Sequence, residues 1–231
     1  MRILLCSIAA AGIAASATSG AQAATRDWPA SGFDRVDLRA AAEVAIRNGP
    51  GFSVHAEGDP RLIERMTANV HQGTLTLGWQ DRDESISLHN SRLHITVTMP
   101  RLAGVGLSGA GTMTIDRVET PQFAADVGGA GTIRIASLRA ERTTLTMGGT
   151  GEIVVAGTTG QLDARVSGVG SINATNLAAR AGRVGMSGTG QIHAQIDGPA
   201  DVTLSGLGHV EIVGRPRCTV HKSGLGSVRC G

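Results

Sequence analysis

The sequence predicts an all-β protein that forms a right-handed parallel β-helix, a β-solenoid, of roughly 20-residue coils with one short N-terminal helix. A nine-residue phrase recurs along the second half, first as LSGAGTMTI at Leu107–Ile115 and last as KSGLGSVRC at Lys222–Cys230. The first glycine of each Gly-x-Gly lies at position 109, 129, 149, 168, 188, 206 or 224, so successive copies are 18 to 20 residues apart. Repetition at this period is typical of a solenoid in which each repeat forms one turn.

Apolar residues stand at every second position on both sides of each Gly-x-Gly. In the third copy they are Leu145 and Met147 before the glycines, and Ile153 and Val155 after them. A period of two indicates two short strands with one buried face each, and a strand pair of this size cannot bury its face alone. We therefore expect neighbouring coils to stack in parallel ladders, with an antiparallel meander as the alternative. Glycine at the corner permits a bend that a β-carbon would hinder.

The N-terminal residues have the features of a secretory signal peptide. Arg2 precedes the apolar stretch Ile3–Ala15, and Ala21-Gln22-Ala23 provides a small-x-small cleavage site. We expect residues 1–23 to be removed and residues 24–231 to form a single domain. Within it, residues 25–100 would form strands and the short helix, and residues 101–231 the Gly-x-Gly coils. The mature protein would be exported to the periplasm, the outer membrane or the cell surface.

Composition argues against two classes of partner. The formal net charge is +2 at pH 7, and no run of Lys or Arg stands out, so nucleic-acid binding has little support. After the signal segment, no stretch is apolar enough to cross a bilayer.

The region before the coils is expected to contain strands around one short helix. Asp59 can cap a helix over Pro60–Met66, because proline suits the first helical position. Its apolar residues Leu62, Ile63 and Met66 would pack against a sheet. The other segments are expected to be a leader (Thr25–Ser31), strands (Phe33–Leu38, Val44–Ile46, Phe52–Val54, Leu93–Met99), a strand pair around a turn at residues 71–73 (Val70, Leu75–Trp79) and a loop (Gln80–Asn90).

The order FDRVDLR, VAIRNGPGFSVHAEGDPRLIERM, GTLTL and LHITVTMPRLAGVGLSGAG resembles the family called putative auto-transporter adhesin, head GIN domain. The resemblance covers nearly the whole mature chain. It implies a right-handed β-helix exported by bacteria with an outer membrane. It supplies no catalytic residue that could be carried over to this sequence.

The glycine-rich phrases do not match known chemical motifs. Gly104-x-Gly106-x-x-Gly109 runs into a strand pattern, so no helix N-terminus is available for a pyrophosphate. Ile133 stands where a calcium-binding nonapeptide needs a carboxylate, and glycine directly follows Ser108 where a nucleophile elbow needs another residue. The seven histidines show no local spacing typical of zinc. The sequence therefore predicts no catalytic residue, cofactor or metal site.

Charged residues fall in two outward columns that would form a surface ladder. The first column stands five residues before the first glycine of successive Gly-x-Gly copies and holds Asp163, Arg183 and Asp201. The second column stands three residues after the second glycine and holds His193, Glu211 and Arg229. One interpretation is a carboxylate pair for sugar cleavage. Alternation of sign favours exposed ion pairs instead, because a catalytic acid needs a raised pKa rather than an adjacent arginine.

Cys218 and Cys230 are the only cysteines after the signal segment. Cys218 lies six residues before Gly224 and Cys230 six residues after it. Because six is an even number, both side chains are expected to point into the final coil, as the apolar columns do. That coil also carries Lys222 where the other copies have an apolar residue. We expect a disulfide between them, because an exported protein meets an oxidising compartment.

The leading functional hypothesis is a non-enzymatic exported envelope protein whose rigid β-helix serves adhesion or binding to a protein or polysaccharide. The alternative is a carbohydrate-active β-helix enzyme, a polysaccharide hydrolase or lyase. A third interpretation is self-association through the end coils, since solenoids leave open edges unless capped.

Overall fold

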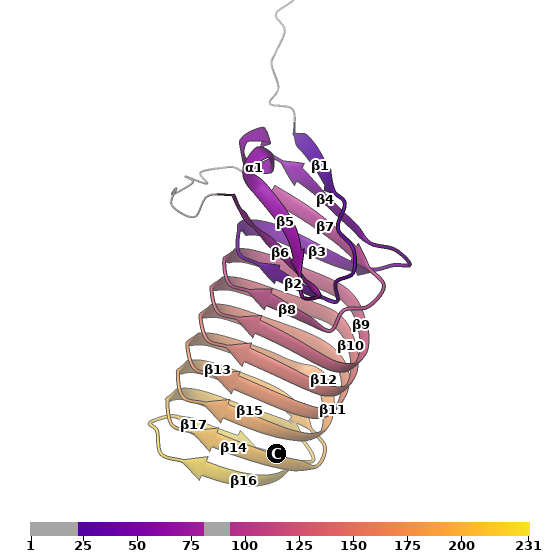
Figure 1. Ribbon diagram of the computed structural model, residues 1–231. Coiled ribbons are helices and arrows are strands. Elements are labelled where there is room, and N and C mark those ends of the chain that lie inside the picture. The colour runs from indigo at the N-terminus through magenta and orange to yellow at the C-terminus, as the bar shows by residue number, and fades with distance from the viewer. Residues whose placement is uncertain (1–22, 81–92) are drawn as a thin grey trace, which may run out of the picture.

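A computed structural model describes residues 23–80 and 93–231. The chain forms a flattened parallel β-solenoid of about six turns, which confirms the predicted fold class (Figure 1). A cap built from the N-terminal strands and the helix lies at one end of the stack, and the C-terminus lies at the other.

The coils are built from long strands that bend at their midpoint and from shorter strands that replace them near the C-terminus. Their bounds are β8 (Gly104–Leu107), β9 (Ala110–Val127), β10 (Ala130–Met147), β11 (Thr150–Val166), β12 (Val169–Met186), β13 (Thr189–Ile196), β14 (Pro199–Leu204), β15 (Leu207–Gly214), β16 (Arg217–Lys222) and β17 (Ser227–Cys230). Every pairing among these strands is parallel, so the antiparallel alternative is wrong for the coils.

Two walls enclose the core. The first wall contains the later halves of β9–β12 together with β8, β14 and β16, and the second contains their earlier halves together with β13, β15 and β17. Equivalent residues of successive coils stack directly, as when Ile133 pairs with Met113 on one side and Ile153 on the other. The repeat period in the sequence is therefore the length of one coil.

The N-terminal region extends both walls. Its elements are β1 (Ala24–Trp28), β2 (Arg35–Leu38), β3 (Ala41–Asn48), β4 (Ser53–Gly58), α1 (Pro60–Arg65), β5 (Met66–His71), β6 (Thr74–Trp79) and β7 (Leu93–Met99). β2 pairs with β8 in the first wall, and β3 pairs with β9 in the second. The helix begins as predicted, with the Asp59 side chain accepting a hydrogen bond from the Arg61 backbone N–H at 2.9 Å.

One prediction for this region is wrong. Thr25–Ser31 is not a leader, because Ala24–Trp28 forms β1 and pairs antiparallel with β4. Asp27 bonds the His55 ring of β4 at 2.8 Å, and Arg26 donates to the Ile63 carbonyl oxygen of α1 at 3.3 Å. Tertiary contacts stabilise this strand. The predicted loop Gln80–Asn90 lies, beyond Gln80, outside the described residues.

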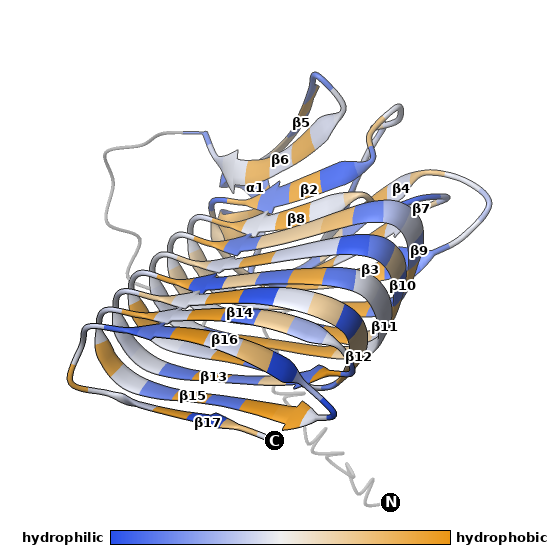
Figure 2. Cartoon of the chain, turned by 90° about the horizontal axis from the view of Figure 1, so that it is seen from below, coloured by the Kyte–Doolittle hydropathy of each residue, from blue (hydrophilic) through white to orange (hydrophobic). Residues whose placement is uncertain are grey.

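Alternate residues along the coil strands β8–β15 are buried, and apolar and polar positions alternate along the ribbon in Figure 2. The last coil departs from this rule. Val220 is 43% exposed, whereas Val202, its ladder partner one coil earlier, is fully buried. Lys222 is also exposed at a position where Leu204 is buried. No described coil packs beyond these two residues.

The glycine corners are needed for contact between coils as well as for the bend. A β-carbon built on Gly129 would lie within 3.0 Å of the Gly109 and Ser108 carbonyl oxygens, closer than real β-carbons come. Gly131 has φ +148° and would meet the Gly111 backbone in the same way. Each glycine therefore lies directly against the equivalent glycine of the preceding coil, which leaves no room for a side chain.

We expect Gly131→Ala to destabilise the fold by more than about 2 kcal/mol, because its methyl group would push neighbouring coils apart. Gly185→Ala is the matched control. Gly185 lies in β12, its φ is outside the left-handed region, and a β-carbon there would meet only the Arg165 side chain at 3.7 Å. Urea unfolding should show a large loss for the first variant alone. Equal losses would contradict the proposed role of the corner.

Some side chains near the bend opposite the glycine corner are smaller in later coils. Ile115 and Phe123 of an early coil correspond to Ala174 and Gly182 three coils later. The Ile196 side chain occupies the space beside Gly182, where an added β-carbon would lie 2.6 Å from its Cδ1 atom. Coil length falls along the same direction, from 20 to 18 residues.

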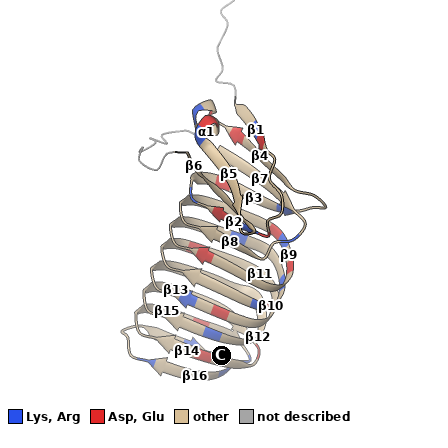
Figure 3. Cartoon of the chain, viewed as in Figure 1, with Lys and Arg blue, Asp and Glu red and all other residues tan. Residues whose placement is uncertain are grey.

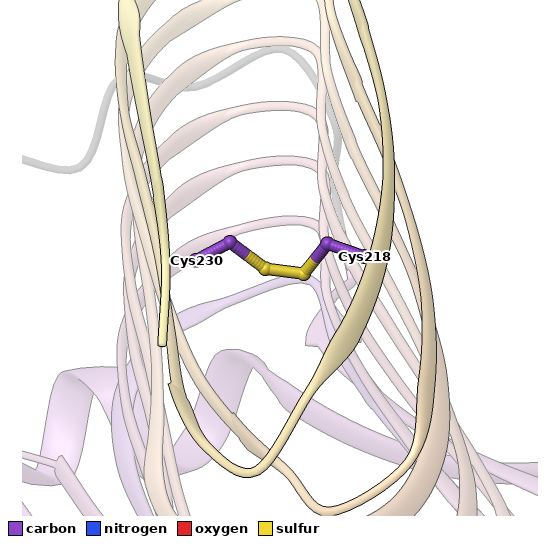
Figure 4. Close-up of a disulfide and its surroundings, with 2 residues drawn as sticks. All are labelled: Cys218 and Cys230. Atoms are coloured by element: carbon purple, nitrogen blue, oxygen red, sulfur yellow. A yellow bond between two sulfur atoms is a disulfide. The ribbon is translucent and has the colours of Figure 1, made fainter.

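The last coil brings the two cysteines within reach of each other. Cys218 on β16 and Cys230 on β17 face each other from opposite walls with a Cα–Cα distance of 6.6 Å, and they form a disulfide (Figure 4). The distance falls within the range that disulfides span. The bond therefore ties the last strand of one wall to the last strand of the other.

Replacing both cysteines with serine should lower the free energy of unfolding by about 3 kcal/mol, because the crosslink no longer restricts the unfolded chain. Dithiothreitol should destabilise the wild type and leave the double variant unchanged. Mass spectrometry of unreduced exported protein provides the direct check, and two free thiols would contradict the crosslink.

Candidate functional site: charged ladders and a groove along the solenoid

The first charged column lies on the outer face of the first wall. Asp163 pairs in register with Arg183, and Arg183 with Asp201. The Asp163 carboxylate is bonded by Arg165 of its own strand at 2.8 Å, while Arg183 reaches Asp201 only at 4.0 Å. Asp163 Oδ1 is buried without a hydrogen-bond partner among the described residues. These contacts form an exposed network of opposite charges, in which the two carboxylates do not face each other.

The second charged column lies on the outer face of the second wall. Glu211 is placed between His193, whose Nδ1 lies 3.2 Å from Glu211 Oε2, and Arg229, whose Nη1 lies 3.5 Å from Glu211 Oε1. His193 Nε2 lies 3.2 Å from Gln191 Oε1. Each ring nitrogen of His193 thus lies within hydrogen-bonding distance of a side-chain oxygen. The two columns are on opposite walls, so the six residues form two surfaces rather than one.

The sequence analysis missed one neighbour of the second column. His209 lies beside it, with its ring centroid 6.1 Å from that of His193 and its Nδ1 2.7 Å from the Ser227 hydroxyl oxygen. The signal was present, because His209 occupies the outward column that also holds Gln191 and Ser227. Within residues 23–80 and 93–231, no group of three or more His, Cys, Asp or Glu side chains is arranged to hold a metal ion.

A groove also escaped the sequence analysis. It follows the bends of five successive coils, opposite the glycine corner, and encloses about 710 Å³. Its charged side chains are Glu119, Arg139, Glu141, Arg180 and Asp197. Small residues of the same bends also line it (Thr120, Ala140, Thr158, Thr159, Gly160, Ala178, Ala179). Small residues at equivalent positions of successive coils leave a continuous channel, which is long enough for an extended polymer.

Charges of both signs alternate along the groove. Glu119 and Arg139 are ladder partners on neighbouring coils. The Asp197 carboxylate accepts a hydrogen bond from the Arg215 backbone N–H at 3.0 Å. Figure 3 shows the same mixture over the visible face, with no continuous patch of one sign. Among the residues that the structure describes, no aromatic side chain lines the groove. The groove therefore offers hydrogen bonds and ion pairs but no aromatic platform for stacking.

One carboxyl group on the first wall has a perturbed pKa. Partial burial, and secondarily the negative charge of Asp37, raise the pKa of Asp126 above its usual value. The two residues lie on β2 and β9, separated by Gly106 of β8. Arg39 and Ser108 bond Asp37 at 2.7 and 3.1 Å. Asp126 lies on the outer face of the first wall and not in the groove, so its raised pKa does not supply a catalytic acid there.

These features define a parallel β-solenoid with mixed-charge ladders on two walls and a groove along its axis. The family model described as putative auto-transporter adhesin, head GIN domain, matches residues 32–216. The chain belongs to this family, which confirms the resemblance drawn from its sequence motifs.

Solved structures share the fold. A putative adhesin from Bacteroides fragilis NCTC 9343 is 23% identical with a TM-score of 0.83, over 91% of this chain and 98% of that one. A putative lipid binding protein from Parabacteroides distasonis ATCC 8503 is 18% identical with a TM-score of 0.68, over 91% and 97% of the two chains. No protein with a curated description matches this chain. In the described ranges, no helix has the length and apolar character needed to span a membrane.

Asp126→Asn should stabilise the protein at neutral pH. Because the folded-state pKa is raised, the folded state holds the proton more tightly than the unfolded state, so stability falls as pH rises from the ordinary value of 3.8 through the folded value. The advantage of the variant over the wild type should vanish below that window. Unfolding at pH 3 to 7 measures it, with Asp116→Asn, an exposed change in the same strand, as the control. A pH-independent difference would contradict this assignment.

Proposed function

We propose that this chain is a non-enzymatic binding module exported to the bacterial envelope, where its groove holds an extended polysaccharide or polypeptide. The groove is the observation that supports this proposal most directly. It spans five coils and presents charges of both signs above small side chains. Such a surface can fix an extended polymer at several points along its length. The two charged columns would add contacts on the outer walls.

Two features support export. Residues 1–23 have the pattern of a signal peptide, and the Cys218–Cys230 crosslink suits an oxidising compartment such as the periplasm or the cell surface. Membership in an adhesin-like family agrees with a binding role in the envelope.

A polysaccharide hydrolase or lyase is the second candidate. The observation that favours it is the presence of Glu119 and Glu141 on neighbouring coils of the groove. Both side chains are exposed, and Arg139 lies beside Glu119 in the ladder. Such exposed surroundings differ from the enclosed pair of carboxylates on either side of a glycosidic bond that sugar cleavage uses. Asp163, the other carboxylate considered, is engaged by Arg165.

Binding of fluorescent polysaccharides from a glycan array tests the proposal. We expect Arg139→Gln with Arg180→Gln to weaken binding about tenfold, because the groove loses both of its arginine side chains as donors to the polymer. Arg47→Gln with Arg61→Gln removes the same charge from exposed positions outside the groove and the charged columns, and should leave binding within about twofold.

Equal affinity of both double variants would overturn the assignment of the groove. Release of reducing ends or unsaturated sugars by the wild type, abolished in Glu141→Gln, would establish the enzyme instead. Binding of polypeptides alone from an envelope extract would identify the polymer as protein.

A further inference from the structure

The C-terminal end of the solenoid leaves two strand edges free. β16 pairs only with β14, and β17 only with β15, among the described strands. Their outer backbone N–H and C=O groups therefore face no strand in this part of the chain. An open edge of this kind is a template for pairing with another polypeptide.

Side chains at this end expose part of the core. Val220 is 43% exposed, and Cys218 and Cys230 are only partly buried, although their columns are buried in earlier coils. A strand added to β16 would cover Val220 and Cys218 as each earlier coil covers its neighbour. The apolar surface thus favours an added strand over a loosely held ligand.

The free edge is basic. Arg217, His221 and Lys222 are exposed on β16, and none of them has an acidic partner among the described residues. Arg229 on β17, by contrast, is already paired with Glu211. Arg217 and His221 share the outward face of β16. A strand that paired with β16 would bring every second side chain within a few ångströms of them, so acidic residues at those positions would be favoured.

A second copy of this chain is a poor occupant. Symmetric antiparallel pairing of β16 with itself keeps outward residues opposite outward residues, so a pair centred on Thr219 places Arg217 opposite His221. Two basic side chains in this position provide no attraction between the copies. Basic edge residues are one means by which proteins prevent edge-to-edge association. Self-association through the end coil is therefore disfavoured.

We propose that β16 is a docking edge for an extended acidic polypeptide segment, which adds to the first wall as one further strand. The disulfide between Cys218 and Cys230 holds both final strands in place, so the edge is ordered before the segment binds. This interaction is distinct from the groove, which lies at the bends of earlier coils.

A short synthetic peptide alternating valine and glutamate is the probe, added to the full chain in its oxidised form. We expect it to bind and to slow backbone hydrogen exchange in β16. Arg217→Glu with Lys222→Glu should weaken binding of this peptide at least about tenfold. The same double variant should bind a second peptide, with lysine in place of each glutamate, more tightly than it binds the first. Arg47→Glu with Arg117→Glu makes the same charge change away from the end and should leave binding unaltered. Melting temperatures verify that both double variants remain folded.

A third peptide separates strand addition from simple charge attraction. It keeps the glutamates but replaces the valines with proline, which cannot supply the ladder hydrogen bonds. Equal binding of this peptide, or exchange protection confined to residues outside β16 and β17, would overturn the proposal. A wild-type dimer in sedimentation analysis that dissociates in Arg217→Glu with Lys222→Glu would also overturn it, because the occupant would then be a second copy.

Discussion

Registered contact between the backbones of successive coils is the constraint on which the structure depends. At the corner, the Gly129 N–H donates to the Leu107 carbonyl and the Ala130 N–H to the Gly109 carbonyl, both at 2.9 Å, so the ladder continues through the turn. This contact excludes side chains at the corner, fixes each apolar column over the next and sets which residues point outward. The charged columns and the groove are consequences of the same register, because each is a column of equivalent positions in successive coils.

Much of this could be predicted because the fold repeats. Once the glycines are aligned, buried columns such as Ile133 and Ile153 follow from period two, and the Cys218–Cys230 pairing follows from shared parity. The helix cap at Asp59 is a local signal and could also be predicted from the sequence. The strand β1 could not be predicted, because Ala24–Trp28 shows no alternation of apolar and polar residues. Its strand conformation comes from antiparallel contact with β4, which is distant in sequence.

The surfaces were harder to predict than the core. The sequence predicts charged outward columns, but it does not state that positions on either side of the glycine corner belong to opposite walls. The groove depends on small residues at the far bends, such as Ala140 and Gly160, where the repeat is weakest and coil length varies. Small residues carry no hydrophobic signal of their own, so their shared role emerges only when the coils are stacked.

The cap and the open edge lie at opposite ends of the stack (Figure 1). Each coil lengthens the stack by one strand spacing, about 4.8 Å. The distance between the two ends is therefore proportional to the number of coils. A family built on this plan can change its reach by duplicating or deleting a single repeat, without redesigning either end. Coil length limits where this is tolerated. An inserted coil must match both neighbours in length, which favours the 20-residue coils near the cap over the shorter ones beyond them.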